Sequence, residues 1–276
     1  MPQTVRTTIK KISGQQSTDE GDLLAVEEPL EIRLVYHAGK VTQQKSVSVT
    51  MRTPGNDEEL AVGFLFTEGI ISSIHDISDV GYCKPDNKNI ICVQLSDTSG
   101  KEFAIPERNF YTTCSCGVCG KASIEAVKTV CTVPETFDTI RIPSSVLYGL
   151  PGKLRSTQDI FDNTGGLHAC ALFDTVGNLL LSREDVGRHN AVDKLIGAAL
   201  LAGMVPLQEH VLMLSGRISF ELVQKAVMAG IKIVAAVGAP SSLAAEMAEE
   251  QGMTLIGFLR GERFNIYSGA ERILMK

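Results

Sequence analysis

Three cysteines lie close together near the middle of the chain, and their surroundings favour reactive thiols. Cys114, Cys116 and Cys119 fall within six positions, and glycines follow two of them directly. The residues after this cluster are good helix formers, with apolar side chains at helical spacing. A helix N-terminus offers free N–H groups and a positive dipole end, which stabilise a thiolate and lower its pKa. The segment therefore predicts nucleophilic sulfur chemistry.

The spacing Cys116-x-x-Cys119 also suits a zinc site or thioredoxin-like disulfide exchange. No second paired cysteine motif accompanies it, and further zinc ligands would have to come from Cys114, Cys131, Cys170 or His168. Zinc deaminases need a His-x-Glu motif, and none of the five histidines is followed by Glu two positions later. Hydrolytic deamination is therefore not expected. Structural zinc, disulfide exchange and purely structural cysteines stay open as alternatives.

The composition describes a globular protein with a sizeable core. The chain has 276 residues, 44% of them hydrophobic, and a formal net charge of −6. Its length suits one large domain or two smaller ones. The negative charge gives no general attraction to nucleic acid or anionic membranes. No apolar run reaches the roughly 18 residues that span a bilayer.

The cysteine count and the N-terminus indicate the compartment. The seven cysteines are odd in number and mostly isolated, so they do not resemble a secreted disulfide framework. No apolar signal-peptide core follows the first residues. We therefore expect a cytoplasmic protein with reduced thiols.

Residues 1–112 are expected to form a small α+β domain. Residues 1–21 are polar and are expected to be loosely ordered. Apolar and polar residues alternate over 31–36 and 43–51, which predicts a β-hairpin. Acidic residues 57–59 suit the start of a helix that ends near Gly69. Further short strands are predicted at 80–82, 89–95 and 102–105.

Residues 113–276 are expected to form a second, layered α/β domain. Strands alternate with helices at spacings that favour partly parallel pairing. The predicted helices are 117–130, 187–201, 218–228 and 242–251, with an irregular or helical connector at 140–154. The predicted strands are 211–214, 232–236 and 254–258, preceded by a hairpin of 167–173 and 179–181.

A dense run of ionisable groups, residues 183–194, marks one strand-to-helix junction as a candidate site. The apolar residues that follow form the predicted buried stripe of the helix, which leaves His189 and Asp193 on another face. His189 could exchange a proton near neutral pH. Alternatively, Asp185 caps the helix and the remaining charges form a solvated network.

Two loops, Ser215-Gly216-Arg217 and Gly238-Ala239-Pro240-Ser241-Ser242, each follow a predicted strand and open a predicted helix. Ligands bind at such strand ends in open α/β sheets, and helix N-termini favour phosphate, although ordinary turns also need Gly and Ser. Arg260 and Arg263 flank a glycine after the last predicted strand. Their guanidinium groups could bind phosphate or a guanine edge, or could be plain surface charges. No P-loop motif occurs, and no G-x-G-x-x-G opens the α/β region.

Taken together, these motifs resemble the formate dehydrogenase accessory sulfurtransferase (FdhD) family. The resemblance runs in order from about residue 28 to residue 267 and covers most of the chain. It rests on residues 52–65, Cys116-Gly117-Val118-Cys119-Gly120-Lys121, Thr164-Gly165-Gly166-Leu167-His168, residues 183–194, Ser215-Gly216-Arg217, residues 220–223, and Gly238-Ala239-Pro240-Ser241-Ser242.

The resemblance implies both a fold and an activity. The fold is a cytidine-deaminase-like three-layer α/β catalytic domain with a smaller N-terminal domain. Members of this family accept sulfur from a cysteine desulfurase as a cysteine persulfide. They deliver it to the molybdenum or tungsten bis(guanine dinucleotide) pterin cofactor of formate dehydrogenase. This sequence would bind that cofactor as a substrate, with no permanently bound cofactor and no metal site, and its two identical arms suggest a homodimer.

The resemblance also assigns roles to residues. Cys116 corresponds to the persulfide carrier, Cys119 assists transfer, and Cys114 adds a third thiol to the family's pair. The cofactor-binding position corresponds to Phe258, Leu259, Arg260, Gly261, Glu262 and Arg263, with Arg217 and His189 as further candidates. Two other classes of protein are alternatives: a cofactor-binding chaperone without sulfur chemistry, and a zinc-stabilised interaction protein.

Overall fold

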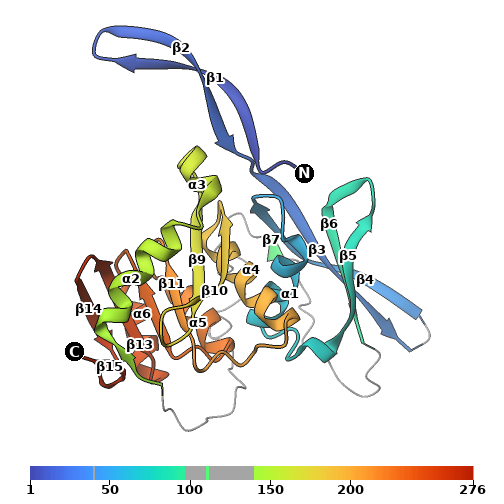
Figure 1. The fold of residues 1–276 in the computed structure, drawn as a ribbon. Helices are drawn as coiled ribbons and strands as arrows, with labels where there is room; N and C mark the ends of the chain where they lie inside the picture. The colour runs from blue at the N-terminus through green and yellow to red at the C-terminus, as the bar shows by residue number, and fades with distance from the viewer. Residues whose placement is uncertain (40, 97–109, 112–139, 276) are drawn as a thin grey trace.

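The computed structural model describes residues 1–39, 41–96, 110–111 and 140–275, which form a mixed α/β fold (Figure 1). The predicted strand at 102–105, the predicted helix at 117–130 and the Cys114–Cys119 cluster lie outside the described residues, as does the predicted domain boundary after residue 112. Among the described helices, none has the length and apolar composition that crossing a membrane requires.

The N-terminal sheet has the strand order β5-β6-β3-β4-β7. Its strands are β3 (Glu28–Ala38), β4 (Val41–Arg52), β5 (Ile77–Lys84), β6 (Asn87–Leu95) and β7 (Phe110–Tyr111). The predicted hairpin is confirmed, because β3 and β4 pair antiparallel along their length. Alternate side chains of β3, namely Leu30, Ile32 and Leu34, are fully buried, so one face of this sheet belongs to the core.

The first residues differ from the expected loose segment. They form an antiparallel hairpin, β1 (Thr4–Ser13) and β2 (Gln16–Ala25), that projects from the body of the molecule (Figure 1). Gly14 has a φ of 60° at the two-residue turn, a conformation that glycine adopts without strain. Most side chains of the hairpin are exposed and none is buried. A strand pair with no buried face needs no apolar alternation, and this explains why the sequence pattern missed it.

A second disagreement with the sequence expectation is a disulfide between Cys83 of β5 and Cys92 of β6. The expectation of reduced thiols is wrong for this pair. The two strands are antiparallel neighbours joined by a tight turn. They therefore bring two cysteines nine residues apart to a Cα–Cα distance of 5.2 Å, which is within bonding reach.

The central sheet has the strand order β10-β9-β11-β12-β13-β14. Its strands are β9 (His168–Phe173), β10 (Leu179–Asp185), β11 (Val211–Leu214), β12 (Ile233–Ala236), β13 (Thr254–Arg260) and β14 (Arg263–Ser268). The neighbouring strands β11, β12 and β13 run parallel, in agreement with the predicted partly parallel sheet, and the other neighbouring pairs are antiparallel. The sequence pattern missed β14, which continues the segment that was expected to be a loop.

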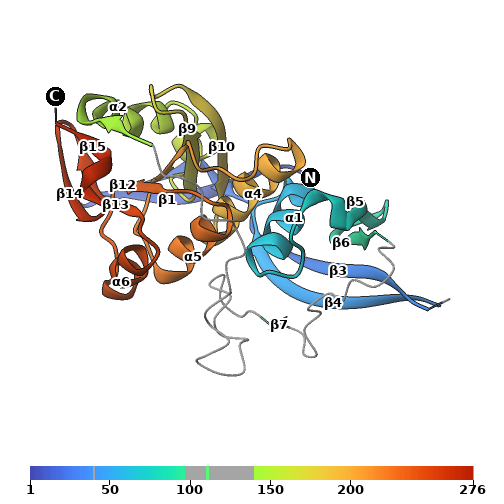
Figure 2. The same ribbon diagram turned by 90° about the horizontal axis from the view of Figure 1, so that it is seen from below.

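Helices fill the space between the two sheets and cover the far side of the central sheet. Figure 2 shows α1 (Asp57–Thr67) and α4 (Arg188–Leu201) between the sheets. These helices share one hydrophobic cluster with α5 (Phe220–Met228), α6 (Ser242–Glu250) and the facing sides of both sheets. On the opposite face, α2 (Ser144–Arg155) packs through Leu147, Leu150 and Leu154. The predicted layers are confirmed, while the cytidine-deaminase-like assignment stays a prediction.

The remaining described elements are short. They are β8 (Ile142–Pro143), which pairs with β15 (Ile273–Leu274), α3 (Asp159–Thr164), and two 3₁₀ turns at Ile74–Asp76 and Ala270–Arg272. The α3 helix lies beside β2 at the base of the projecting hairpin.

Candidate functional site

The loops that follow the parallel strands meet at the carboxyl edge of the sheet. The N–H of Gly238, after β12, donates to the carbonyl of Gly216, after β11, at 3.1 Å. The N–H of Phe258 donates to the carbonyl of Gly238, also at 3.1 Å. A Cβ on Gly238 would lie 2.7 Å from the Gly216 oxygen, so only glycine permits this approach. The glycines therefore fix one shared rim of three loops.

The β13–β14 turn carries the two predicted arginines at this rim. Arg260 and Arg263 pair across the turn, and Gly261 adopts the positive φ of 56° that the turn requires. Both arginines are exposed, and neither has an ion-pair partner among the residues that the structure describes. A cavity of about 490 Å³ lies here, lined by Val237, Phe258, Arg260, Arg263, Phe264 and Asn265.

Two other residues of the predicted cofactor segment differ in their surroundings. Phe258 has a φ of 54°, which is rare for a bulky residue, and its side chain is 48% exposed. Leu259 is fully buried in the core beneath α2. Its side chain is thus unavailable to a ligand, and only its backbone lies near the rim.

A second cavity, of about 440 Å³, adjoins the first at Val237. His168, Ser215 and Gly216 line it, together with residues of α2 and α3. Ser215 joins β11 to β9, because its Oγ accepts the N–H of Ala169 at 2.9 Å. Arg217 follows Gly216 and is exposed. The rim therefore carries Arg260 and Arg263 in the lining of the first cavity and Arg217 next to a residue that lines the second.

The imidazole of His168 faces a cationic neighbourhood. Partial burial lowers the pKa of His168, and the nearby charges of Arg188, His189 and Arg217 lower it further. The side chain is therefore neutral at neutral pH. Within the described part of the chain, the Nε atom of Arg188 is buried without a hydrogen-bond partner.

His189 does not join the exposed arginines. Its ring is buried between α4 and α5, with Nε2 lying 3.2 Å from Oγ of Ser219 and 3.7 Å from Oε2 of Glu221. The nearby His189 is the main cause that lowers the pKa of Glu221 to about 2. The structure thus gives His189 a packing and charge-pairing position instead of an open ligand site.

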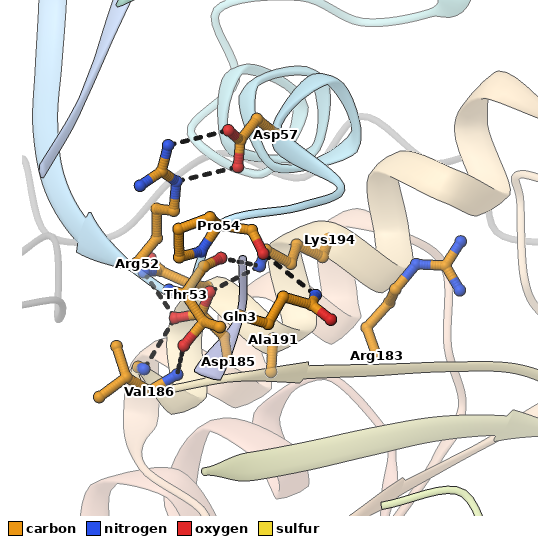
Figure 3. A network of polar contacts seen from close by, with 12 residues as sticks. Gln3, Arg52, Thr53, Pro54, Asp57, Arg183, Asp185, Val186, Ala191 and Lys194 are labelled. Carbon is orange, nitrogen blue, oxygen red and sulfur yellow. Dashed lines mark hydrogen bonds and ion pairs between the residues drawn. The ribbon is translucent and has the colours of Figure 1, made fainter. Parts of the chain in front are cut away.

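Residues of the charged run 183–194 form a buried network of ion pairs and hydrogen bonds with the segment 52–59, and we call this network the buried seam (Figure 3). Oδ2 of Asp185 accepts the N–H of Thr53 at 3.1 Å and lies 2.7 Å from Nζ of Lys194. That ammonium also donates to the Thr53 carbonyl at 2.8 Å. All three residues are essentially inaccessible to solvent. A solvated network is therefore the wrong interpretation, and the helix begins after Gly187 with no side-chain cap.

The same seam continues through the segment 52–59. Arg52 donates two hydrogen bonds to the carboxylate of Asp57, both at 2.9 Å, and this pair is buried. Arg183, which points away from Thr53 in Figure 3, makes a bidentate pair with Glu59. The charged run 183–194 and the segment 52–59 thus form one interface between the N-terminal sheet and the central sheet.

Cys170 is not available as a zinc ligand. Its side chain is fully buried, and its thiol donates to the Ala191 carbonyl at 3.1 Å. Burial raises the pKa of this thiol, so it stays protonated, whereas zinc needs a thiolate. Among the described residues, no group of three or more His, Cys, Asp or Glu side chains is arranged to hold a metal ion.

Comparison with known proteins identifies the family. The family model described as "FdhD/NarQ family" matches residues 25–274. A protein of Mycolicibacterium paratuberculosis named "Sulfur carrier protein FdhD" is 50% identical, over 99% of this chain and 100% of the relative. A protein of the same name from Saccharolobus solfataricus is 41% identical, over 97% of each chain.

The fold agrees with this result. The chain is similar to a crystal structure described as a formate dehydrogenase accessory protein from Desulfotalea psychrophila. The TM-score is 0.76 at 25% identity, and the match covers 99% of this chain and 100% of the other. Sequence motifs, full-length relatives and architecture agree. The chain therefore belongs to the FdhD/NarQ family.

Proposed function

We propose that this chain is a sulfur carrier for formate dehydrogenase maturation. It accepts sulfur from a cysteine desulfurase as a persulfide on Cys116. It transfers that sulfur to the molybdenum or tungsten bis(guanine dinucleotide) pterin, its substrate, before insertion into formate dehydrogenase. The observation that carries the proposal is the full-length similarity to relatives named "Sulfur carrier protein FdhD", in a chain that has the family's Cys116-Gly117-Val118-Cys119 motif.

The sulfur chemistry needs only thiolate exchange steps. The Cys116 thiolate attacks the outer sulfur of the desulfurase persulfide, and the desulfurase cysteine leaves as a thiolate. Cys116 then carries an outer sulfur atom. Attack by the Cys119 thiolate on the inner sulfur, Sγ of Cys116, would release the outer sulfur atom as hydrosulfide and leave a Cys116–Cys119 disulfide. Each step breaks and forms one bond to sulfur.

The cationic rim supports a substrate that carries phosphates. Arg260 and Arg263 line the cavity of about 490 Å³, and Arg217 adjoins Gly216 and acts electrostatically on His168, two residues that line the cavity of about 440 Å³. This local positive charge contrasts with the net charge of −6 of the whole chain. Guanidinium groups bind phosphate oxygens and guanine edges in a bidentate way. The two arginines of the β13–β14 turn would hold one nucleotide arm, and Arg217 would hold a phosphate beside the second cavity.

The partners follow from the reaction. A cysteine desulfurase would dock as the sulfur donor and formate dehydrogenase as the client, both in the cytoplasm. A homodimer would present two equivalent rims to a substrate with two identical arms. Sedimentation analysis tests the dimer directly, and a purely monomeric mass would remove it from the proposal.

A functional assay separates this proposal from that of a chaperone without sulfur chemistry. The readout is formate dehydrogenase activity in cells that lack the endogenous gene for this protein. Cys116→Ala with Cys119→Ala should abolish activity, because the sulfur route is lost. Arg260→Ala with Arg263→Ala should also lower activity and weaken binding of guanosine diphosphate. Arg6→Ala, on the projecting hairpin, is the matched control. Full activity of the double cysteine variant would favour the chaperone.

A further inference from the structure

Cys83 and Cys92 precede the Cys114–Cys119 cluster in the sequence and lie on the outer face of the N-terminal sheet. Ile91 and Val93, the neighbours of Cys92 in β6, are fully buried, so the alternation of the strand turns Cys92 away from the core. Both cysteines are partly exposed, and β5 is an edge strand of the sheet order. A dithiol in solution can therefore reach this disulfide without unfolding the protein.

Gln44 makes the two sulfur atoms unequal. It reaches from β4 across β3, and its Nε2 lies 2.9 Å from Sγ of Cys92 and 3.7 Å from Sγ of Cys83. An amide N–H that donates to sulfur stabilises the thiolate over the thiol. Cys92 is therefore the better leaving group, and Cys83 is the sulfur that an incoming thiolate should attack.

The disulfide closes a hairpin that contacts the buried seam. The hydroxyl of Tyr82, next to Cys83, donates to Oδ2 of Asp57 at 2.9 Å. Arg52 donates to the Lys88 carbonyl at 3.1 Å, on the other arm of the same hairpin. Since Arg52 and Asp57 form the buried ion pair of the seam, the hairpin supplies contacts to both members of that pair.

We propose that Cys83 and Cys92 form a redox-active dithiol/disulfide site, separate from the sulfur-carrying cysteines and reduced by a dithiol of the thioredoxin class. One thiolate of the reductant attacks Sγ of Cys83, and Cys92 leaves as a thiolate beside Gln44. The second thiol of the reductant, once deprotonated, then attacks the mixed disulfide and releases Cys83 as a thiolate. Two electrons pass to the protein, and the reductant ends as a disulfide.

Reduction has a structural consequence as well. Without the disulfide, no covalent bond joins the two arms of the hairpin around Lys88, and strand pairing and its hydrogen bonds to Arg52 and Asp57 must hold it. Its contacts to Arg52 and Asp57 should loosen, while the ion pair itself stays buried. We expect reduction to lower Tm by a few degrees and to increase amide hydrogen exchange in β5 and β6, with little change in the central sheet.

The test is differential alkylation of the folded protein. The chain is titrated with reduced dithiothreitol, quenched with N-ethylmaleimide and digested with trypsin. Cleavage after Lys88 puts Cys83 and Cys92 on separate peptides that only the disulfide joins. The joined peptide should convert to two alkylated peptides while the fully buried Cys170 stays unlabelled, and Gln44→Leu should slow the conversion several-fold.

Two results would overturn the proposal. One is that Cys83 and Cys92, once reduced, stay fully alkylatable after treatment with an excess of oxidised glutathione. The other is that the joined peptide resists reduction until Cys170 is labelled too, since the disulfide then opens only on unfolding. The Cys83→Ser/Cys92→Ser variant should still gain sulfur on Cys116. Failure of this site is thereby distinguished from failure of the proposed sulfur transfer.

Discussion

Gly63 of α1 and Gly197 of α4 face each other where the two helices cross. A Cβ on Gly63 would lie 1.9 Å from the Asp193 carbonyl oxygen, and a Cβ on Gly197 would lie 1.9 Å from the Glu59 carbonyl oxygen. No side chain fits at either distance, so the helix backbones themselves are in contact. This crossing brings together the two motifs that form the buried seam.

Alanine at either glycine should destabilise the protein. Because the clash is with backbone, the helices must separate, and we expect a loss of about 2–3 kcal/mol or more in the free energy of unfolding. Gly149→Ala in α2 is the control, since nothing lies within 4 Å of its Cβ position. It should be neutral or stabilising by up to about 1 kcal/mol. Urea unfolding measures all three, and equal stability of the Gly63, Gly197 and Gly149 variants would contradict the crossing.

Because Asp185 and Lys194 form a buried ion pair, we expect substitutions at the two positions to have coupled effects on the free energy of unfolding. Lys194→Met leaves the Asp185 carboxylate buried without its cation and should cost about 3–5 kcal/mol. Combining it with Asp185→Asn should cost less than the sum of the two single changes. The exposed pair of Arg155 and Asp162 is the control, and Asp162→Asn should cost no more than about 1 kcal/mol. Additive losses at the buried pair would show that it is not coupled.

The pair of His189 and Glu221 predicts a dependence on pH. The proximity of His189 holds the pKa of Glu221 at about 2, against 4.5 for the free group. The resulting stability is present above pH 4.5 and is lost as the pH falls from 4.5 to about 2. In His189→Ala the pKa of Glu221 should rise toward its ordinary value, with a smaller rise in Ser219→Ala. NMR titration of the carboxyl group measures this, and a Glu221 pKa near 4.5 in the unmodified protein would refute it.

At Phe258 we expect a substitution to weaken ligand binding without lowering the stability of the protein, because the backbone of this residue is strained. A φ of 54° costs a non-glycine residue roughly 1–2 kcal/mol, while the side chain, 48% exposed, contributes little burial. Phe258→Gly should therefore be at least as stable as the parent chain, yet bind guanosine diphosphate more weakly if the ring contacts the ligand. Phe258→Leu keeps the strain and is the control. Lower stability of Phe258→Gly with unchanged affinity would show that the residue has a packing role only.

Local pattern predicted elements well where one side of the element is buried. The alternation in residues 31–36 identified β3, and the apolar stripe beginning at Val192 identified α4. Projecting strands gave no such signal: β1 and β2 have polar residues on both faces. For β14, Phe264 and Ile266 do alternate with more exposed residues, but the stretch is short and directly follows a turn, and its pairing with β13 shows that it is a strand.

The candidate site was also predicted only in part, because local patterns reveal strand-end loops but not contacts between distant segments. Strand-end loops at Gly216 and Gly238 follow from topology, so their meeting was predictable. The role of the charged run was not, because Asp185 bonds to Thr53, a partner that no local pattern connects to it. Residues 52–59 and 183–194 both carry charges of both signs next to a predicted helix start. Comparing these two charged segments with each other is the signal that could have suggested a buried network.

The most direct test of sulfur transfer is intact-mass spectrometry of the protein after incubation with a cysteine desulfurase and cysteine. The unmodified chain should gain the mass of one or more sulfur atoms, and a thiol reductant should remove that mass. Cys116→Ala should abolish the gain, while Cys114→Ala and Cys119→Ala should retain it. No gain in any form, together with stoichiometric bound zinc, would contradict a sulfur carrier and favour a zinc-stabilised interaction protein.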